Sequence, residues 1–582
     1  MKKTLLSLSA LFFALPGAAQ NCDSDAGLTP IAQIQGSATQ SPKLGEQITT
    51  IGVVTQNWSA KEQLGGLFLQ STQQQQDNDS NTSEGLFIKA SGKVYQDIKA
   101  GTLLKVTGTV NETDGLTMLT NTTAVFECGQ AEAVSPVELT LPFTSEQQAE
   151  AHEGMLVTIS ADQPLTISGH YPLARHGYFD VSAGRLWTPT QIAKPGAAAQ
   201  ALAKSNQLNR LQIDDNSQTQ PQQLPHQQLF HGPQNSLRSG ATIKPVTGIL
   251  SQFRDDYRLQ PTTAPQLDQR SQITAIVPKL SDNIRIASFN MLNYFNGDGQ
   301  GNGFPTERGA RSPAQLQRQQ DKLVAAITAL KADVVGLMEV ENDGFEQHSA
   351  IRELVDAIND ASRIDYAIAQ PRSTRVGTDQ ISVGIIYNPQ RLTPVSHAAT
   401  LEQGPFRRGS RVPLAQTFKV EGVEQPLTVV VNHFKSKGSC PDDGINANQN
   451  DGQACWNALR VESAQELLSW IEQQQLPNPV LLGDFNAYYQ EDPIQYFIEN
   501  GYPNVSDAKE YSYVYDSQAG SLDHIFVHQS LVPKVSHTQH VNFNADEPVS
   551  YDYRDADYYQ PGPYRSSDHD PLLLDLSWSE DD

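Results

Sequence analysis

Short apolar runs alternate with amphipathic segments along the second half of the chain. The apolar runs are rich in Val, Ile and Leu, as expected of strands buried on both faces of a sheet. They occupy residues 284–290, 333–339, 381–387, 427–432, 480–483, 522–527 and 571–576. The segments 313–330, 350–358 and 456–474 repeat apolar residues at the spacing of one helix face. This alternation predicts a mixed α/β layered domain over residues 276–582.

The first half of the chain has a different pattern, with short β-branched runs separated by Gly and polar loops. Such runs at 47–56, 66–70, 85–89 and 103–110 predict that residues 21–130 form a β-rich, OB-like barrel domain. Residues 131–275 add strand-like runs without a catalytic signature, so we expect a second β-rich module and a linker there. OB barrels often bind nucleic acid or sugar, but fold analogy alone supports binding weakly.

The first twenty residues have the pattern of a secretory signal peptide. Lys2 and Lys3 precede an apolar run at 5–15, and small residues suited to cleavage follow near Ala19. The run is too short to span a bilayer, and no later stretch approaches the roughly 18 apolar residues a span needs. We therefore expect a secreted protein, extracellular or in transit through a periplasm, with no membrane anchor.

Charge and cysteine content narrow the function further. A formal net charge of -24 excludes a surface designed as a whole to attract phosphate. A nucleic-acid substrate would need local positive charge and help from a metal ion. Four cysteines in an exported protein predict two disulfides with three possible pairings. We expect Cys440 to pair with Cys455 around a polar loop, and Cys22 with Cys128 around the first domain.

Polar side chains stand at the ends of the predicted strands. Asp484 and Asn486 directly follow the apolar run that closes at Gly483. Alone, this pattern is more typical of an Asx turn than of a site. Carboxylates, amides and imidazoles at the other strand ends make chance a poor explanation, so a site at the rim of the sheet is expected. These other positions are Asn290, Glu339, His433, Asp523, Asp568 and His569.

Six short motifs resemble those of the endonuclease/exonuclease/phosphatase superfamily, which includes deoxyribonuclease I and the apurinic endonucleases. They are Ser288-Phe-Asn290, Leu337-Met-Glu339, Val431-Asn-His433, Gly483-Asp-Phe-Asn486, Leu522-Asp523-His and Ser567-Asp-His569-Asp-Pro, in the superfamily's order. The resemblance implies a four-layered α/β sandwich for the catalytic domain. The signal peptide and the preceding β-rich module are similar to bacterial extracellular nucleases of the ExeM/NucH type.

The resemblance also implies a metal site. It makes Glu339 the principal ligand of a divalent ion, with Asn290 and Asp568 close by. A hard ion takes oxygen ligands and keeps several waters, so one or two carboxylates suffice. Mg²⁺ is the expected ion, with Mn²⁺ as an alternative and Ca²⁺ in a structural or co-activating role.

The same resemblance assigns catalytic roles. Asp484 would position or activate the attacking water, or hold a second ion, and Asn486 would orient the phosphate. His569 would contact the phosphate as a general base or as an electrostatic stabiliser, with Asp523 fixing its tautomer. His433 would be the acid for the leaving 3′ oxygen. Isolated histidines and asparagines of this kind are more often structural.

Basic residues cluster near the predicted rim. Clusters of basic residues more often only form a solvent-exposed face. Because the chain as a whole is negatively charged, however, a gathering of basic residues at this rim favours a role in substrate binding. The candidates are Arg308, Arg311, Arg407, Arg408, the neighbouring Arg411, and Lys435. Asp379 is a candidate support for His433.

We therefore expect a secreted, metal-dependent nuclease that hydrolyses phosphodiester bonds of extracellular DNA, with RNA as another substrate and a monomeric state assumed. One alternative is another secreted phosphodiesterase or phosphatase of the same fold, such as a sphingomyelinase. A second is a non-catalytic, polysaccharide-binding surface protein. Endonuclease and exonuclease action both stay open.

Overall fold

The computed structural model describes residues 22, 27–90, 93–229 and 237–578. The predicted signal peptide lies outside these residues. The chain divides into two compact units. Unit 1 comprises residues 1–160, 211–221 and 245–264, and unit 2 comprises 161–210, 222–244 and 265–582. The stretch 131–275, expected as one module and linker, therefore contributes to both units.

Unit 1 is built from a closed five-stranded barrel and a further sheet. The barrel order is β1-β2-β3-β5-β4, and its interior holds buried side chains such as Val54, Leu67, Leu86 and Leu104. The other strands follow the order β10-β13-β12-β7-β6. The elements of unit 1 are α1 Ile31–Gln35, β1 Gln47–Trp58, β2 Gly66–Gln70, β3 Gly85–Lys89, α2 Lys93–Gln96, β4 Thr102–Thr113, β5 Leu116–Gln130, β6 Val137–Leu141, α3 Glu146–Glu150, β7 Leu156–Ala161, β10 Leu211–Ile213, β12 Val246–Phe253 and β13 Asp256–Pro261. The β-rich N-terminal region is confirmed, and its likeness to OB barrels stays a prediction.

Unit 2 begins with a small β-rich part that precedes the layered domain. Its strands pair in the order β14-β11-β8-β9. The elements are β8 Leu165–Gly169, α4 Leu173–His176, β9 Phe179–Ala183, α5 Pro189–Ile192, α6 Ala197–Leu208, the 3₁₀ helix η1 Gln227–Leu229, β11 Thr242–Ile243 and β14 Leu267–Gln269. We call residues 161–210 of this part the insertion segment.

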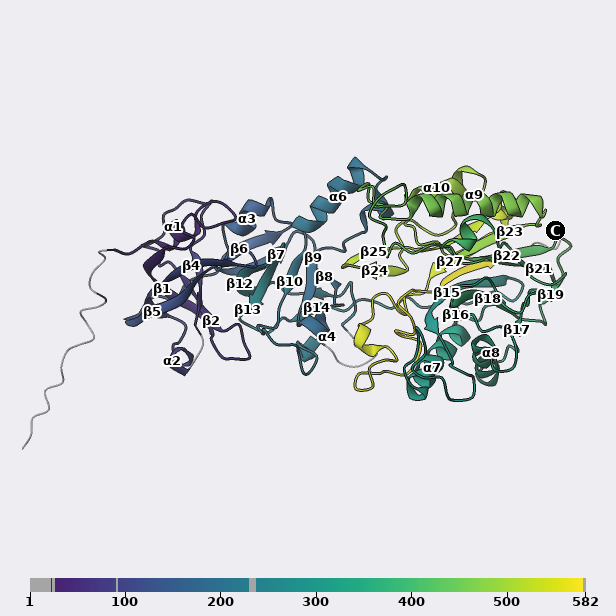
Figure 1. The fold of residues 1–582 in the computed structure, drawn as a ribbon, viewed down its shortest axis with the longest axis horizontal. Helices are drawn as coiled ribbons and strands as arrows, with labels where there is room; N and C mark the ends of the chain where they lie inside the picture. The colour runs from purple at the N-terminus through teal and green to yellow at the C-terminus, as the bar shows by residue number, and fades with distance from the viewer. Residues whose placement is uncertain (1–21, 23–26, 91–92, 230–236, 579–582) are drawn as a thin grey trace, which may run out of the picture. The chain divides into compact units, whose positions relative to one another are not determined.

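The remainder of unit 2 is a four-layered α/β sandwich. One sheet has the order β17-β18-β16-β15-β28-β27, and the other has β19-β21-β22-β23-β26 with β20 beside β21. Helices α7 and α8 cover the outer face of the first sheet, and α9 and α10 cover that of the second (Figure 1). The helices are α7 Pro313–Leu330, α8 Ala350–Ala361, α9 Asn457–Gln473 and α10 Asp492–Glu499, with 3₁₀ helices η3 Gly404–Arg407, η4 Gln529–Lys534 and η5 Val549–Tyr551. The strands are β15 Ile284–Tyr294, β16 Val334–Glu341, β17 Ala367–Ile368, β18 Ile381–Tyr387, β19 Leu392–Pro394, β20 Ala399–Thr400, β21 Leu414–Val420, β22 Leu427–His433, β23 Pro479–Asp484, β24 Tyr513–Tyr515, β25 Gln518–Gly520, β26 Asp523–Val527, β27 Val535–His540 and β28 Leu572–Leu576.

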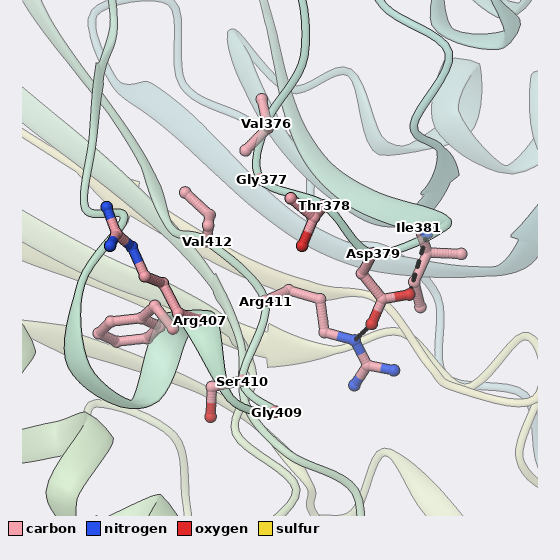
Figure 2. Close-up of a pocket in the computed structure, with 11 residues that line it drawn as sticks. Val376, Gly377, Thr378, Asp379, Ile381, Arg407, Gly409, Ser410, Arg411 and Val412 are labelled. Carbon is pink, nitrogen blue, oxygen red and sulfur yellow. Dashed lines mark hydrogen bonds and ion pairs between the residues drawn. The ribbon is translucent and has the colours of Figure 1, made fainter.

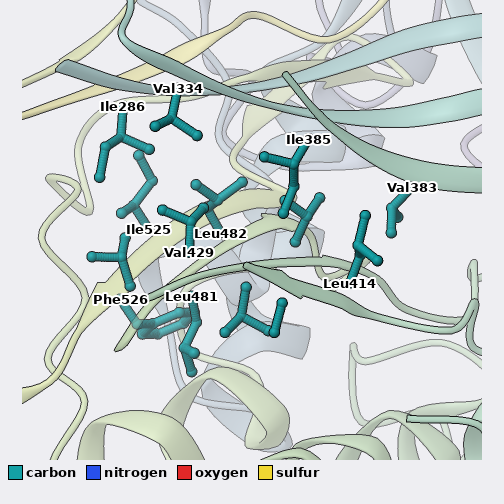
Figure 3. Close-up of a cluster of buried hydrophobic side chains, with 14 of the residues drawn as sticks. Ile286, Val334, Val383, Ile385, Leu414, Val429, Leu481, Leu482, Ile525 and Phe526 are labelled. Carbon is teal, nitrogen blue, oxygen red and sulfur yellow. The ribbon is translucent and has the colours of Figure 1, made fainter. Parts of the chain in front are cut away.

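Both faces of the central strands are buried, which explains their continuous apolar runs. In β15, Ile286 packs between the sheets while Phe289 packs toward α7 and α8. Figure 3 shows Ile286, Leu482 and Ile525 among the side chains gathered between the two sheets. Gly336 permits this close approach, since a Cβ there would lie 2.4 Å from Leu482 Cδ1. The predicted mixed α/β fold is confirmed.

The strand directions bring the polar ends to one edge. β15 and β16 run parallel in the first sheet, and β22 and β23 run parallel in the second. β26 runs antiparallel to β23, with Asp523 opposite Asp484. The carboxyl ends of four strands and the start of β26 therefore contribute to the same rim.

Both predicted disulfides are present. Cys22 and Cys128 have Cα atoms 5.7 Å apart, and those of Cys440 and Cys455 are 5.5 Å apart. Within the described ranges, no helix is both long and apolar enough to cross a membrane.

A pair of neighbouring carboxylates, Asp214 buried and Asp215 partly buried, follows β10 in unit 1. Asp214 accepts from Arg258 Nη1 at 3.0 Å, and Asp215 accepts from the backbone N–H of Ser217 at 3.0 Å. Burial raises the pKa of Asp214 to about 6. Burial and then the charge of Asp214 raise the pKa of Asp215 to about 7. The structure records no ion pair between Asp215 and a described residue, and burial beside the charge of Asp214 outweighs the favourable charge of Arg258, so ionised Asp215 destabilises the fold.

We predict that Asp215→Asn stabilises unit 1 in a pH-dependent way. The folded-state pKa lies above the unfolded value, so the wild-type protein loses stability as pH rises from about 4 to about 7. The amide keeps the acceptor for Ser217 without the charge. Thermal or urea unfolding should show a gain of about 1–2 kcal/mol at pH 8, discounted for partial exposure, that disappears near pH 4.

Asp255→Asn is the matched control, because Asp255 is an exposed carboxylate of unit 1 and its replacement should leave the free energy of unfolding unchanged at both pH values. An Asp215→Asn variant that is less stable than wild type at pH 8 would contradict the assignment.

Candidate active site

The polar residues predicted at the strand ends come together at the rim of the sandwich. Asn290 and Glu339 lie in β15 and β16 of the first sheet, and His433 and Asp484 end β22 and β23 of the second. The cluster is completed by Asp523 at the start of β26 and by His569, which precedes β28.

His569 is held by a buried carboxylate. Its Nδ1 lies 2.7 Å from Asp523 Oδ2, which also accepts from Ser512 Oγ at 2.6 Å. Its Nε2 lies 4.0 Å from Asp484 Oδ2. Burial alone would lower the pKa of His569, but the charge and hydrogen bond of Asp523, with Asp568 and Asp484, raise it well above its ordinary value. The imidazole is thus oriented with Nε2 toward the site.

Asp484 lies deeper than a rim residue would. Its side chain is only 3% exposed, and its Oδ2 accepts from Asn290 Nδ2 at 3.2 Å while Oδ1 accepts from the Asn486 N–H at 2.8 Å. Burial raises the pKa of Asp484 to about 7, against the opposing charge of His569. The carboxylate is therefore fixed in place by neutral donors.

Glu339 adopts a backbone conformation that is rare for its residue type. Its φ of 64° lies in the left-handed region, where strain is typical of functional sites. Oε2 accepts from the Asn293 N–H at 2.9 Å, and Oε1 lies 4.0 Å from His433 Nε2. Burial, followed by the charge of Asp568, raises the pKa of Glu339. The strained backbone turns this carboxylate toward the cluster.

His433 stands between the carboxylates and an arginine. Its Nε2 lies 3.6 Å from Asp484 Oδ2 and 3.4 Å from Arg411 Nη1. Burial and then Arg411 lower the pKa of His433 well below its ordinary value, so the ring is neutral at neutral pH. In the part of the chain that is described, Nδ1 has no hydrogen-bond partner. Arg411 is anchored in turn by Asp379, 3.2 Å from its Nε, so Asp379 supports His433 through Arg411 rather than directly.

Asn486 closes the turn after β23. Its Nδ2 donates to Phe434 O at 3.1 Å, which ties the ends of β22 and β23 together. The turn needs Gly483, whose φ is 137° and whose Cβ, if present, would lie 2.0 Å from Asn432 O. Contact of Asn486 with a phosphate stays a prediction.

The oxygen donors at the rim suit a hard cation. Among the described residues, no group of three or more His, Cys, Asp or Glu side chains is arranged to hold a metal ion. Mg²⁺ often uses only one or two carboxylates and keeps several waters, so this finding does not conflict with such an ion. Glu339, partly exposed beside Asn290 and Asp568, has the donor chemistry such an ion prefers.

The predicted substrate-binding residues divide into paired and unpaired groups. Arg308 lies 3.6 Å from Asp379 Oδ1, Arg408 forms an ion pair with Glu462, and Lys435 Nζ lies 5.1 Å from the Trp456 ring centroid. For Arg311, only its backbone N–H bonds a described residue, Gln315 at 2.8 Å.

Arg407 and Arg411 line a pocket between the 376–381 and 406–412 segments. Figure 2 shows Arg411 pointing to Asp379 across this pocket, whose volume is about 140 Å³. Because Arg411 also contacts His433, the pocket adjoins the cluster of polar strand ends.

The sequence motifs did not reveal three neighbours of the cluster. These are the Arg411 contact with His433, Ser512 behind Asp523, and Tyr513, whose ring stacks on His569 at 4.6 Å. The alternating aromatic run Tyr511–Tyr515 was the available signal for Tyr513.

Several solved structures each match about half of the chain. The human Nocturnin catalytic domain with bound sulfate anion is 15% identical, with a TM-score of 0.33, and covers 52% of this chain and 96% of that one. D. rerio TDP2 complexed with single strand DNA product is 14% identical, with a TM-score of 0.32, covering 51% and 100%. An endonuclease/exonuclease/phosphatase family protein from Bacteroides thetaiotaomicron is 16% identical, with a TM-score of 0.33, covering 50% and 97%.

A search of curated proteins finds no match. Residues 287–569 match the sequence model of the Endonuclease/Exonuclease/phosphatase family. This span begins within β15 and ends at His569, so it includes every strand end that contributes to the cluster. Residues 287–569 therefore form an endonuclease/exonuclease/phosphatase family domain.

Proposed function

We propose that the protein is a secreted, divalent-metal-dependent nuclease that hydrolyses phosphodiester bonds of extracellular DNA, similar to bacterial extracellular nucleases of the ExeM/NucH type. The observation that carries this proposal is the cluster of Glu339, His433, Asp484 and the Asp523–His569 pair inside the family domain. Its groups correspond to the needs of the reaction: an oriented water, stabilisation of the phosphate charge, and a proton for the leaving oxygen.

The protein's own residues divide these tasks by geometry. Asp484, fixed by Asn290 and Asn486, is the acceptor that orients the attacking water. His569, oriented by Asp523, presents Nε2 to a phosphate oxygen and stabilises developing negative charge. His433 lies next to both carboxylates and is placed to pass a proton to the leaving oxygen once substrate charge is present.

A divalent ion would complete the site. Glu339 would hold it, with Asn290 and Asp568 beside it, and Mg²⁺ is the ion we favour, with Mn²⁺ as an alternative. The ion would shield the phosphate charge and favour ionisation of a bound water.

DNA is the favoured substrate and RNA the next. The pocket that carries Arg407 and Arg411 adjoins His433, so an anionic chain could extend from it to the cluster. Two disulfides and the signal-peptide pattern of residues 1–20 support secretion. We assume a monomer, and the OB-like barrel is a candidate for holding part of the polymer.

We predict that Asp484→Asn abolishes hydrolysis without loss of the fold. The amide has the same shape and can still accept from Asn486, but it cannot serve as a charged acceptor for water. We expect kcat to fall by about 10²–10⁴-fold in plasmid cleavage, with a cooperative unfolding transition retained.

Asp507→Asn is the control, because Asp507 is an exposed carboxylate in the same unit. Cleavage within a factor of about ten of wild type, or failure of Asp484→Asn to fold, would return Asp484 to a structural role.

Metal removal should stop the reaction. We expect EDTA to abolish cleavage of plasmid, linear and single-stranded DNA, and added Mg²⁺ or Mn²⁺ to restore it, because the ion beside Glu339 would shield the phosphate charge and favour ionisation of a bound water. Parallel assays with RNA and sphingomyelin compare the alternative substrates. Cleavage that resists the chelator, or that is undiminished in His569→Ala, would overturn the mechanism.

The salt dependence of KM should show whether the basic residues bind the phosphates of the substrate. Counterion release predicts that log KM rises linearly with log salt, and each lost phosphate contact lowers the slope by about one. We expect Arg311→Gln and Arg407→Gln each to lower it.

Arg363→Gln should not change this slope. Arg363 lies between α8 and β17, and β17 pairs with the end of β18 that lies beside the start of β16, at the opposite end of the sheet from the cluster. A wild-type KM that does not vary with salt would contradict polymer binding through these arginines.

A further inference from the structure

A short aromatic hairpin lies against the catalytic histidine. β24 and β25 form a two-stranded sheet, and the Tyr513 ring of β24 stacks on His569 with centroids 4.6 Å apart and planes 29° apart. Tyr513 also stacks with Tyr515, at 6.4 Å and 11°. Tyr513 is partly buried, whereas Tyr515 is 64% exposed. A row of nearly parallel rings therefore leads from the imidazole to solvent.

The insertion segment fixes one strand of this hairpin through its backbone. Ala519 N donates to Leu186 O at 2.9 Å, and Thr188 N donates to Ala519 O at 2.8 Å. Asn206 Nδ2 adds a bond of 2.7 Å to Gln518 Oε1. β25 is thus bonded on one edge to β24 and on the other to residues more than 300 positions earlier.

The turn of the hairpin is fixed as well. Asp516 and Ser517 have φ of 46° and 62°, as in the tight two-residue turns that connect the strands of a β-hairpin. Arg210 Nη1 lies 2.8 Å from Asp516 Oδ1, and Ser517 Oγ donates to Asp180. Gly169 lets the turn pack closely, because a Cβ there would lie 2.1 Å from Ser517 Oγ. Tyr515, directly before the turn, is therefore an exposed ring on a rigid support.

We propose that Tyr515 is a stacking platform for a nucleobase adjacent to the scissile phosphate. Single-stranded nucleic acid is commonly bound by aromatic side chains on which bases stack, with little dependence on sequence. Parallel rings at this spacing already extend from His569 to Tyr515, so a base would continue the row while its own phosphate lies toward the cluster. This inference rests on the nuclease function proposed above.

A choline headgroup is the other ligand an exposed tyrosine could attract. Quaternary ammonium groups are usually held by several aromatic faces arranged as a cage. At this hairpin the rings lie parallel in a row, which suits a flat base better than a cation. Stacking would also order the base with little loss of side-chain freedom, since the hairpin is bonded in place.

The test compares oligonucleotides that carry bases beside the cleavable phosphodiester with oligonucleotides that lack them. Single-stranded oligonucleotides carry one phosphodiester among methylphosphonate linkages, flanked either by thymidines or by abasic tetrahydrofuran residues. For wild type we expect kcat/KM to be about tenfold higher with flanking bases. Tyr515→Ala should reduce this ratio to about one, and Tyr515→Phe should keep it, because the ring is retained.

Tyr171→Ala is the matched control, since Tyr171 is a tyrosine of the insertion segment with 78% exposure, and its ratio should equal that of wild type. A wild-type ratio retained in Tyr515→Ala would overturn the stacking proposal while leaving the nuclease function intact. A wild-type ratio near one would overturn it too. Absence of any cleavage by the metal-supplied wild type would instead overturn the proposed function itself.

Discussion

Two carboxylates are forced together by strand pairing, and the rest of the site depends on how their charge is compensated. Asp484 and Asp523 are opposite residues of β23 and β26, so both face the same edge of the sheet. Like charges at a buried edge repel strongly. His569 is placed to relieve this repulsion, 2.7 Å from Asp523 and 4.0 Å from Asp484. The His569 imidazole is therefore a structural counter-charge to both carboxylates.

The architecture explains why these charges can be buried at all. Parallel pairs β15–β16 and β22–β23 direct their carboxyl ends to one rim, where neutral donors such as the Asn290 amide and the Asn486 N–H satisfy Asp484. The close approach of the sheets requires Gly336, and the turn that presents Asp484 requires Gly483. These two glycines thus determine where the charged side chains of the site lie.

Local pattern was sufficient to predict the sheets, the Cys440–Cys455 disulfide and the polar strand ends, because each depends on residues near one another in sequence or on a short motif. The pairing of Cys22 with Cys128, 106 residues apart, was predicted because these two cysteines bracket the first domain. It was not sufficient for the depth of Asp484, which follows from Asn290 packing against it across the sheets. The neutral state of His433 depends on its burial and then on Arg411, and the orientation of His569 depends on Ser512 behind Asp523. Such contacts arise only when distant strands meet.

The insertion segment shows the same limit on a larger scale. It has no catalytic signature in sequence, yet Arg185 Nη1 lies 2.9 Å from Asp546 Oδ1, and Tyr511 donates to the other oxygen of that carboxylate at 2.6 Å. Tyr511 directly precedes Ser512 and Tyr513, the two residues that contact the Asp523–His569 pair. Since the insertion segment also bonds β25, it positions both ends of the aromatic run. The functional unit around His569 therefore begins about a hundred residues before the family domain, in a stretch that periodicity assigns to a separate module.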